Sequence, residues 1–401
     1  MNNSKQILAA LGAAFVSLLL VSCGGGGDGP SGTTNPLVGT GATNPSVTPY
    51  PISPSAAPAT TCDINGGSAQ AYTAVGEFKV YRGDCVMSLS LSSAEWSTLL
   101  SSPGGRFDKQ KYDQLFASRF KDAFDFVVFA LDTPAVPAGF GYVGYYSTAN
   151  NRYPVRKARL LGTMVLANVR GQNPIKGGPM LHEFMHEWGN LGLLPSPGDS
   201  SHWGFSSAGG QLGGFQNGTL VQLSADTWRA TGPATTCLPD ATAQALARCQ
   251  PPSSFGTFAN GGNRIAYSQL ELFSMGLVEA STVPATRVAK DGQWIDAANG
   301  IFKATNWDTF SAEQVFANAA GKIPASAGGQ KHFRMATVVL TPNNVLDADL
   351  LIDLNSTLAG FTGDSVPSYG VVEGLLFNQN FYTATKGLAT MRAGKLLSEA
   401  K

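Results

Sequence analysis

The chain has 401 residues but only four histidines, and three of them, His182, His186 and His202, fall within 21 residues. The first two begin and end the segment HEFMH, residues 182–186, which fits the pattern HExxH. Residues four positions apart share one face of a helix, so both imidazoles can reach one ion at about 2.0–2.1 Å. Glu183, one step around the helix, can take a proton from metal-bound water and pass it to a leaving amine. The segment therefore predicts a hydrolytic zinc site with His182 and His186 as ligands and Glu183 as the general base.

The residues around the motif indicate a short helix. Gly, Gly and Pro at 177–179 are typical of a turn with proline just inside a helix start. Gly189 and Gly192 provide a stop. Apolar residues recur at the spacing of one buried helix face, at Leu181, Phe184, Met185 and Trp188. Two alternatives stay open at this point: an amphipathic helix with surface histidines, and an inactive remnant that still binds metal.

The motif resembles that of zincin metallopeptidases, and Gly189 makes it most similar to metzincin-like secreted bacterial enzymes with the pattern HExxHxxG. The resemblance covers about residues 125–277 and is specific only at the motif. It implies an α+β fold with a mixed sheet over an HExxH active-site helix, Zn2+ as cofactor, and a protein or peptide substrate. The chain departs from metzincins at Gly192, the position of their third ligand, because glycine has no side chain. The third ligand must therefore come from elsewhere.

Two later residues are candidates for that ligand. His202 follows a loop rich in glycine and proline, which lets the chain turn back towards the helix. Glu271 lies in Tyr267–Leu277, which resembles a segment of bacterial exported proteins that carry HExxH and a His-Trp pair. It would complete a site of two histidines and one carboxylate, or orient a ligand histidine from outside. We expect His202 to be the ligand, because Met275 then has a role as a methionine floor beneath the metal. An ordinary core helix at 267–277 is the alternative.

The flanking sequence predicts the elements that position the motif. Phe126–Leu131 and Leu160–Val169 are apolar runs typical of buried strands, and Tyr112–Phe124 and Ala348–Leu358 indicate helices. Zincin-like folds place a strand immediately before the motif helix, and its edge pairs with extended substrate. By that resemblance, we expect the edge strand at Leu160–Val169. His332, beside a strand-like run, is expected to be structural.

The N-terminus is typical of an export signal. Lys5 precedes the apolar run Ile7–Val21, which is short for a membrane span. The run ends in Leu-Val-Ser-Cys at 20–23, which resembles the bacterial lipobox, where the cysteine is lipidated and becomes the mature N-terminus. We therefore expect a signal peptide at 1–22 and lipidation of Cys23, with an ordinary cleaved signal as the alternative. Gly24 in place of Asp favours the outer membrane or cell surface, and the lipid anchor is the only membrane contact expected.

The chain after the signal divides by composition. Residues 24–61 contain a single charge, Asp28, and are rich in Gly, Ser, Thr and Pro, so we expect a flexible tether at 23–61. We expect a zincin-like catalytic domain at 62–290. Residues 291–401 have strand and helix signals but no motif, and are expected to form a C-terminal subdomain or a module.

Five cysteines fit this organisation. With Cys23 assigned to lipidation, four remain, and an even number in an exported chain favours disulfides. Proximity in the sequence suggests Cys62–Cys85 and Cys237–Cys249, while two other connectivities stay open. A zinc site of these four is less favoured because no CxxC pair exists. A thiol at Cys85 that blocks a catalytic metal is a minor alternative.

Composition narrows the function classes. The 27 basic residues balance the 27 acidic ones, which argues against a nucleic-acid partner. Together with the motif, this makes an anchored zinc endopeptidase that hydrolyses extracellular protein the leading hypothesis. The alternatives are a surface binding lipoprotein with a structural or decayed zinc site, and a zinc hydrolase of a non-peptide bond such as a glycan amide. An intact Glu183 argues against decay, because a structural site needs no base.

Overall fold

The computed structural model describes residues 62, 70–101, 107–134, 143–147, 158–170, 173–195, 201–234, 252–324, 326–365 and 378–401. For residues 143–147 only the backbone is described. Cys23, Cys237 and Cys249 lie outside these ranges, as do the predicted signal peptide and the whole of the predicted tether. Within the described ranges, no helix is long and apolar enough to cross a membrane.

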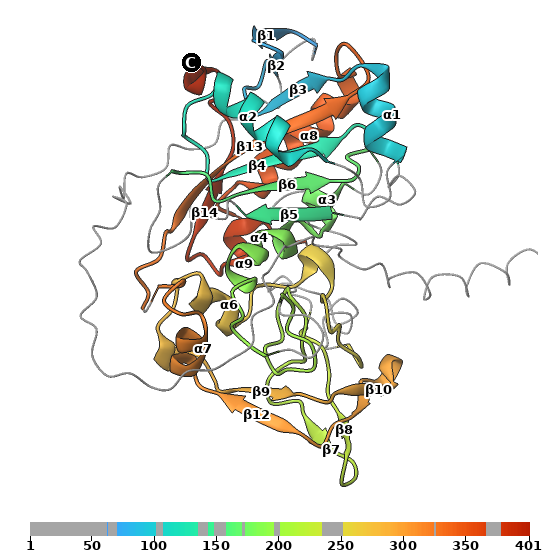
Figure 1. The fold of residues 1–401 in the computed structure, drawn as a ribbon, viewed down its shortest axis with the longest axis vertical. Coiled ribbons are helices and arrows are strands. Elements are labelled where there is room, and N and C mark those ends of the chain that lie inside the picture. Colours follow the sequence, from blue (N-terminus) through green and yellow to red (C-terminus); the bar gives the residue numbers. More distant parts are fainter. Residues whose placement is uncertain are drawn as a thin grey trace, which may run out of the picture.

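The described chain has an α+β fold built on a mixed eight-stranded sheet (Figure 1). In spatial order its strands are β1 (Tyr72–Val75), β2 (Phe78–Tyr81), β3 (Val86–Ser90), β13 (His332–Thr341), β4 (Phe126–Leu131), β6 (Gly162–Leu166) and β5 (Val143–Ser147), and β14 (Thr390–Arg392) pairs with β13. The central strands β3, β13, β4 and β6 run parallel, and β14 is parallel to β13. The strands at the two ends, β1, β2 and β5, are antiparallel to their neighbours.

Strand β4 shows why the sheet forms here. All six of its side chains are buried, which is typical of parallel strands covered on both faces. Phe126 and Val128 belong to the hydrophobic core on one face, whereas Val127 and Phe129 belong to the core on the other. This alternation is the two-residue period of a strand.

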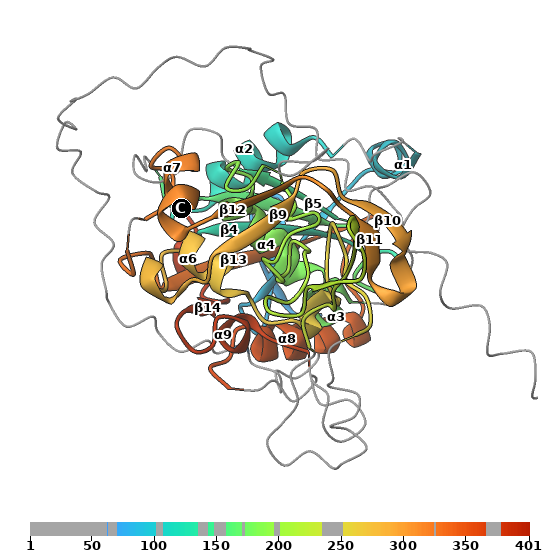
Figure 2. The same ribbon diagram turned by 90° about the horizontal axis from the view of Figure 1, so that it is seen from below.

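Helices cover both faces of the sheet, as Figure 2 shows from below. On one face lie α1 (Ser93–Ser101) and α2 (Lys109–Arg119), and Phe116 of α2 packs into the core there. The opposite face carries α3 (Pro174–Gly177), α4 (Met180–Gly189), α8 (Ala348–Phe361) and α9 (Phe381–Ala384). The Phe184 ring of α4 lies 4.7 Å from the Phe126 ring of β4, centroid to centroid, which fixes the motif helix against the sheet.

Most predicted elements occur near their predicted positions, but the predicted edge strand is wrong. Phe126–Leu131 is β4, the predicted helix at 112–124 is α2, and the one at 348–358 is α8. The run at 160–169 contains β6, yet β6 is an inner strand, because β4 pairs with one side of it and β5 with the other. The end strand beside α4 is β5, which the sequence analysis did not predict.

The chain after residue 290 contributes to the same sheet as the chain before it. Strand β13 lies between β3 and β4 and pairs with both. Strand β9 (Thr286–Ala289) also pairs with β12 (Trp307–Phe310) across the predicted boundary. Residues before and after 290 therefore share the main sheet and the β9–β12 pair.

A second layer of structure lies below α4 in Figure 1. Its largest sheet has the order β10, β11, β8, β7, and its core is aromatic, with Phe205, Phe215, Phe255 and Phe302. The elements of the chain not yet placed are β7 (Val221–Gln222), β8 (Thr227–Arg229), η1 (Gly262–Arg264), α6 (Gln269–Ser274), η2 (Ala280–Thr282), β10 (Gln293–Asp296), η3 (Ala297–Asn299), β11 (Ile301–Lys303), α7 (Ala312–Asn318) and η5 (Leu397–Glu399). Helix α4 thus lies between this layer and the main sheet.

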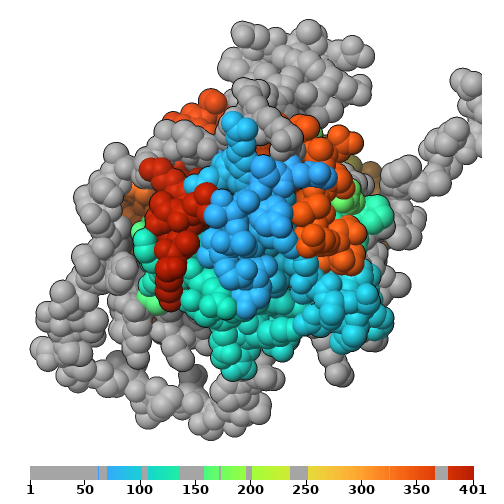
Figure 3. Space-filling view, turned by 90° about the horizontal axis from the view of Figure 1, so that it is seen from above, coloured from blue at the N-terminus to red at the C-terminus, as the bar shows by residue number. Residues whose placement is uncertain are grey.

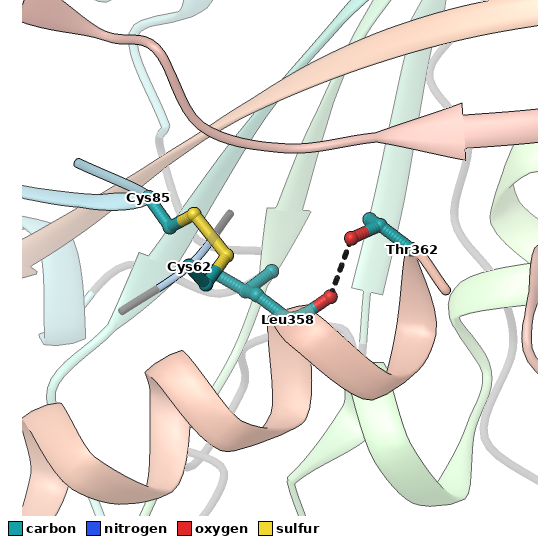
Figure 4. The surroundings of a disulfide bond; sticks show 4 residues. All are labelled: Cys62, Cys85, Leu358 and Thr362. Atoms are coloured by element: carbon teal, nitrogen blue, oxygen red, sulfur yellow. Dashed lines mark hydrogen bonds between the residues drawn. A yellow bond between two sulfur atoms is a disulfide. The ribbon is translucent and has the colours of Figure 1, made fainter. Parts of the chain in front are cut away.

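A disulfide joins Cys62 to Cys85, immediately before β3, and lies beside Leu358 of α8 (Figure 4). This is the pairing that proximity in the sequence suggested. The first strands and the C-terminal residues lie side by side on the upper face (Figure 3). There the Leu397 backbone N–H donates to an Asp84 carboxylate oxygen over 2.8 Å.

Candidate metal centre

Helix α4 holds the HExxH segment in a buried position. Its hydrophobic side chains Leu181, Phe184 and Met185 are all fully buried. The helix start is fixed from outside, because the Asn263 side-chain oxygen accepts from the Leu181 backbone N–H over 3.1 Å. The Tyr267 hydroxyl donates to the Leu181 carbonyl over 2.8 Å. These contacts set the direction of the helix, and with it the direction of the motif side chains.

The structure brings His182, His186 and His202 together. One ligand-capable atom from each lies within 4.8 Å of the others, and the three side chains are almost fully buried. The ring centroids of His182 and His186 are 4.7 Å apart, and His202 lies 5.3 Å from His182 and 4.9 Å from His186. His202 comes from the loop after α4, so that loop turns back to the helix.

Hydrogen bonds at the Nδ1 atoms leave the Nε2 atoms of the α4 histidines facing one another. His182 Nδ1 lies 2.8 Å from the Gln211 carbonyl oxygen, which can only accept, so this nitrogen carries the proton. His186 Nδ1 lies 2.7 Å from Asn190 Oδ1. The two Nε2 atoms are 3.1 Å apart, close to the roughly 3.3 Å expected for two nitrogens bound to one tetrahedral zinc.

His186 has the protonation state that a metal requires. Burial, followed by the charges of His182 and His202, holds the pKa of His186 well below its ordinary value, so its imidazole is neutral. Neutral imidazoles are the form that binds metal. Two neutral rings with protonated Nδ1 atoms present lone pairs to each other, and a cation between them removes that repulsion. His202 Nδ1 is 3.1 Å from Ser201 Oγ, so all three rings have an oxygen partner at Nδ1.

Glu183 lies on the same helix and is almost fully buried. Its Oε1 atom has no hydrogen-bond partner in the described part of the chain. Burial raises the pKa of Glu183 to about 8 in the absence of an ion. A buried carboxylate oxygen without a partner costs about 1–3 kcal/mol or more, and such atoms are typical of functional sites. A water on a nearby cation would provide that partner, and the positive charge would favour the carboxylate form.

Glu271 occupies a different position from the one a third ligand needs. Its carboxylate is fully buried at the start of α6 and accepts from four N–H groups. These donors are Trp203 Nε1, Gln211 N, Leu212 N and Ser268 N, at 2.9–3.0 Å. Met275 is buried in the main core directly after α6. Its role as a floor beneath the metal stays a prediction.

Sequence reasoning missed several residues that position the histidines. Asn190 could have been found, because it follows His186 by four residues and therefore lies on the same helical face. Gln211 could not, because it acts through its backbone carbonyl, which every residue has. Packing explains why residue 189 is a glycine. A Cβ there would lie 2.1 Å from Leu212 Cδ1, so glycine lets the loop approach α4.

Comparison of the chain with models of protein families, with curated proteins and with solved structures returned no match. The resemblance to zincins therefore rests on the motif residues alone.

Proposed function

We propose that this protein is a zinc-dependent endopeptidase with a zincin-like arrangement of sheet and helix. The observation that carries the proposal is the buried three-histidine cluster, with a buried glutamate beside it on the same helix. His182, His186 and His202 would hold the ion through nitrogen. When bound, Zn2+ supplies a Lewis acid and lowers the pKa of a coordinated water to about 7.

Glu183 performs the proton transfers in this proposal. Its carboxylate accepts a proton from the attacking water and then donates that proton to the leaving amine, so that it ends unprotonated. The burial of Glu183 keeps bulk water away from the proton during its transfer. Removing the carboxylate charge while keeping the side-chain shape should therefore stop turnover and leave the metal in place.

A catalytic site fits the cluster better than a structural one. Structural zinc sites are closed by four protein ligands, whereas catalytic sites use three and leave one position open. In the described ranges, the candidate ligand group has three members. This supports a hydrolase over a binding lipoprotein with a structural zinc.

The sheet edge next to the motif helix supports the proposal that the substrate is a peptide. Strand β5 ends the sheet order and packs beside α4. In the described part of the chain, its outer side pairs with no further strand. An extended peptide can add to such an edge through backbone hydrogen bonds. This proposal moves the substrate edge from the predicted run at 160–169 to β5.

Export and lipid anchoring belong to the same proposal. They are supported by the signal-like run and the Leu-Val-Ser-Cys segment that ends at Cys23. The Cys62–Cys85 disulfide suits an oxidising compartment. No nucleic-acid partner is proposed.

The proposal is tested by hydrolysis of an unfolded protein substrate such as casein. We expect activity in the purified protein, loss of that activity with a chelator, and recovery when zinc is added back. A protein that binds zinc but cleaves neither casein nor a peptide library would contradict the endopeptidase. Activity that persists without metal would contradict the zinc mechanism.

A further inference from the structure

The buried carboxylate of Glu271 lies outside the histidine cluster. It accepts hydrogen bonds from Gln211, which contacts His182, and from Trp203, which follows His202. Glu271 is fully buried, and its two oxygens accept from four N–H groups on three separate segments. Four charge-assisted hydrogen bonds fix a carboxylate far more firmly than a helix cap requires. The capping box with Ser268 uses only one of the four donors.

The other three donors belong to the chain that presents the histidines. Gln211 donates its N–H to Glu271 Oε2, and its carbonyl oxygen accepts from His182 Nδ1. One peptide residue thus connects Glu271 to His182. Leu212 donates its N–H to Glu271 Oε1, and its carbonyl accepts from the Trp203 N–H over 2.8 Å.

Trp203 connects Glu271 to the third histidine. Its Nε1 donates to Glu271 Oε1 over 3.0 Å, and the residue before it is His202. Trp203 is fully buried, so its indole has one position in the core. The loop also approaches closely, since a Cβ on Gly210 would lie 2.0 Å from Glu271 Oε2.

Glu271 is itself attached to the motif helix. Tyr267, just before α6, donates its hydroxyl to the Leu181 carbonyl of α4, and α6 packs against α4. The carboxylate is therefore fixed relative to His182 and His186. Its hydrogen bonds hold the loop 201–216 in a fixed position relative to the same two histidines.

We propose that Glu271 is a positioning residue that orients His182 and His202 for metal binding by holding Trp203 and Gln211. It acts through other residues and does not touch the ion or the substrate. The inference depends on the metal-binding part of the proposed function and not on the reaction that the site carries out. Partners of this kind typically change metal affinity by about 10–100-fold when they are removed.

The test is metal binding by a Glu271→Gln variant of the full chain. Glutamine keeps the size of the side chain but turns one acceptor into a donor that faces N–H groups. We expect the zinc Kd, measured by chelator competition, to weaken by about 10–100-fold. We also expect a changed visible absorption spectrum of the cobalt-substituted protein, because the ligand geometry shifts.

Two further variants separate positioning from general stability. Asp108→Ala removes the side-chain cap of α2, on the opposite face of the sheet, and should lower thermal stability without changing the zinc Kd or the cobalt spectrum. Trp203→Phe removes the indole N–H donor and keeps a smaller aromatic ring, so it should weaken zinc binding even if Glu271→Gln does not fold.

Either of two results would overturn the inference. The first is a folded Glu271→Gln, or in its absence a folded Trp203→Phe, with the wild-type zinc Kd and cobalt spectrum. The second is a wild-type protein that binds neither zinc nor cobalt, which would also end the proposed function. A wild type that binds zinc and hydrolyses nothing would contradict only the endopeptidase.

Discussion

At the scale of single residues, the candidate site depends on which nitrogen of each histidine is engaged. The Nδ1 atoms of His182 and His186 lie within hydrogen-bond distance of oxygens, and their Nε2 atoms lie 3.1 Å apart. His332 is not part of this group: it lies at the start of β13, and its Nδ1 is 2.9 Å from Thr390 Oγ1.

We expect His202→Ala to lose most zinc affinity, because two histidines alone leave a catalytic site one ligand short. His332→Ala is the matched control and should keep the wild-type zinc content. The measurement is zinc per protein after dialysis, with folding checked by circular dichroism. Full zinc occupancy in His202→Ala would show that the third ligand is another residue.

The sequence predicted the residues of the candidate site better than it predicted the residues that position them. HExxH and the His-Trp pair are side-chain patterns, so His182, Glu183, His186 and His202 could be named in advance. The role of Gln211 rests on a carbonyl, and that of Gly210 on contact with a residue 61 positions away in the chain. No local pattern encodes either.

At the scale of elements, α4 and α6 form a support of packed helices, and the loop 201–216 must pack closely against both of them. The loop approaches so closely that Gly189 and Gly210 have no room for a Cβ. The predicted strand at 160–169 was placed correctly but given the wrong role. Pairing partners in a sheet are set by contacts distant in sequence, and β5 does not stand out as an apolar run.

Gly210→Ala should destabilise the fold by about 1–3 kcal/mol, because the new methyl group overlaps the Glu271 carboxylate. It should also weaken zinc binding, since the carboxylate must move. Gly177→Ala is the matched control: a Cβ there meets nothing within 4 Å, so stability should be unchanged or slightly higher. Thermal unfolding of the two variants checks this, and equal melting temperatures would contradict the packing argument.

At the scale of the whole molecule, β13 joins the early and the late parts of the described chain in one sheet. Cys62 is bound beside β3, and β13, β4 and β6 lie between β3 and the strand β5 next to α4. The central position of β13 places residues after 290 in the same sheet as residues before it. A strand without a chemical motif carries no sign in its sequence that it joins a sheet begun 260 residues earlier, at Tyr72.

The sequence predicts a flexible tether at 23–61 between an anchor at Cys23 and the folded chain. Cys23→Ser should therefore release the protein from membranes and leave hydrolysis unchanged. Membrane fractionation together with activity of the soluble fraction measures both effects. Retention of the variant on membranes would contradict the lipid anchor, and released but inactive protein would contradict the separation of anchor and site.

The central claim is that the three histidines bind zinc and that Glu183 moves the proton. It is tested most directly by measuring zinc stoichiometry and casein hydrolysis together in the wild type and in Glu183→Gln, with Glu313→Gln, an exposed glutamate of α7, as control. We predict one zinc per chain in all three proteins and a loss of turnover of about 100–10,000-fold in Glu183→Gln alone. Near-normal turnover in Glu183→Gln, or a wild type without zinc, would contradict the account.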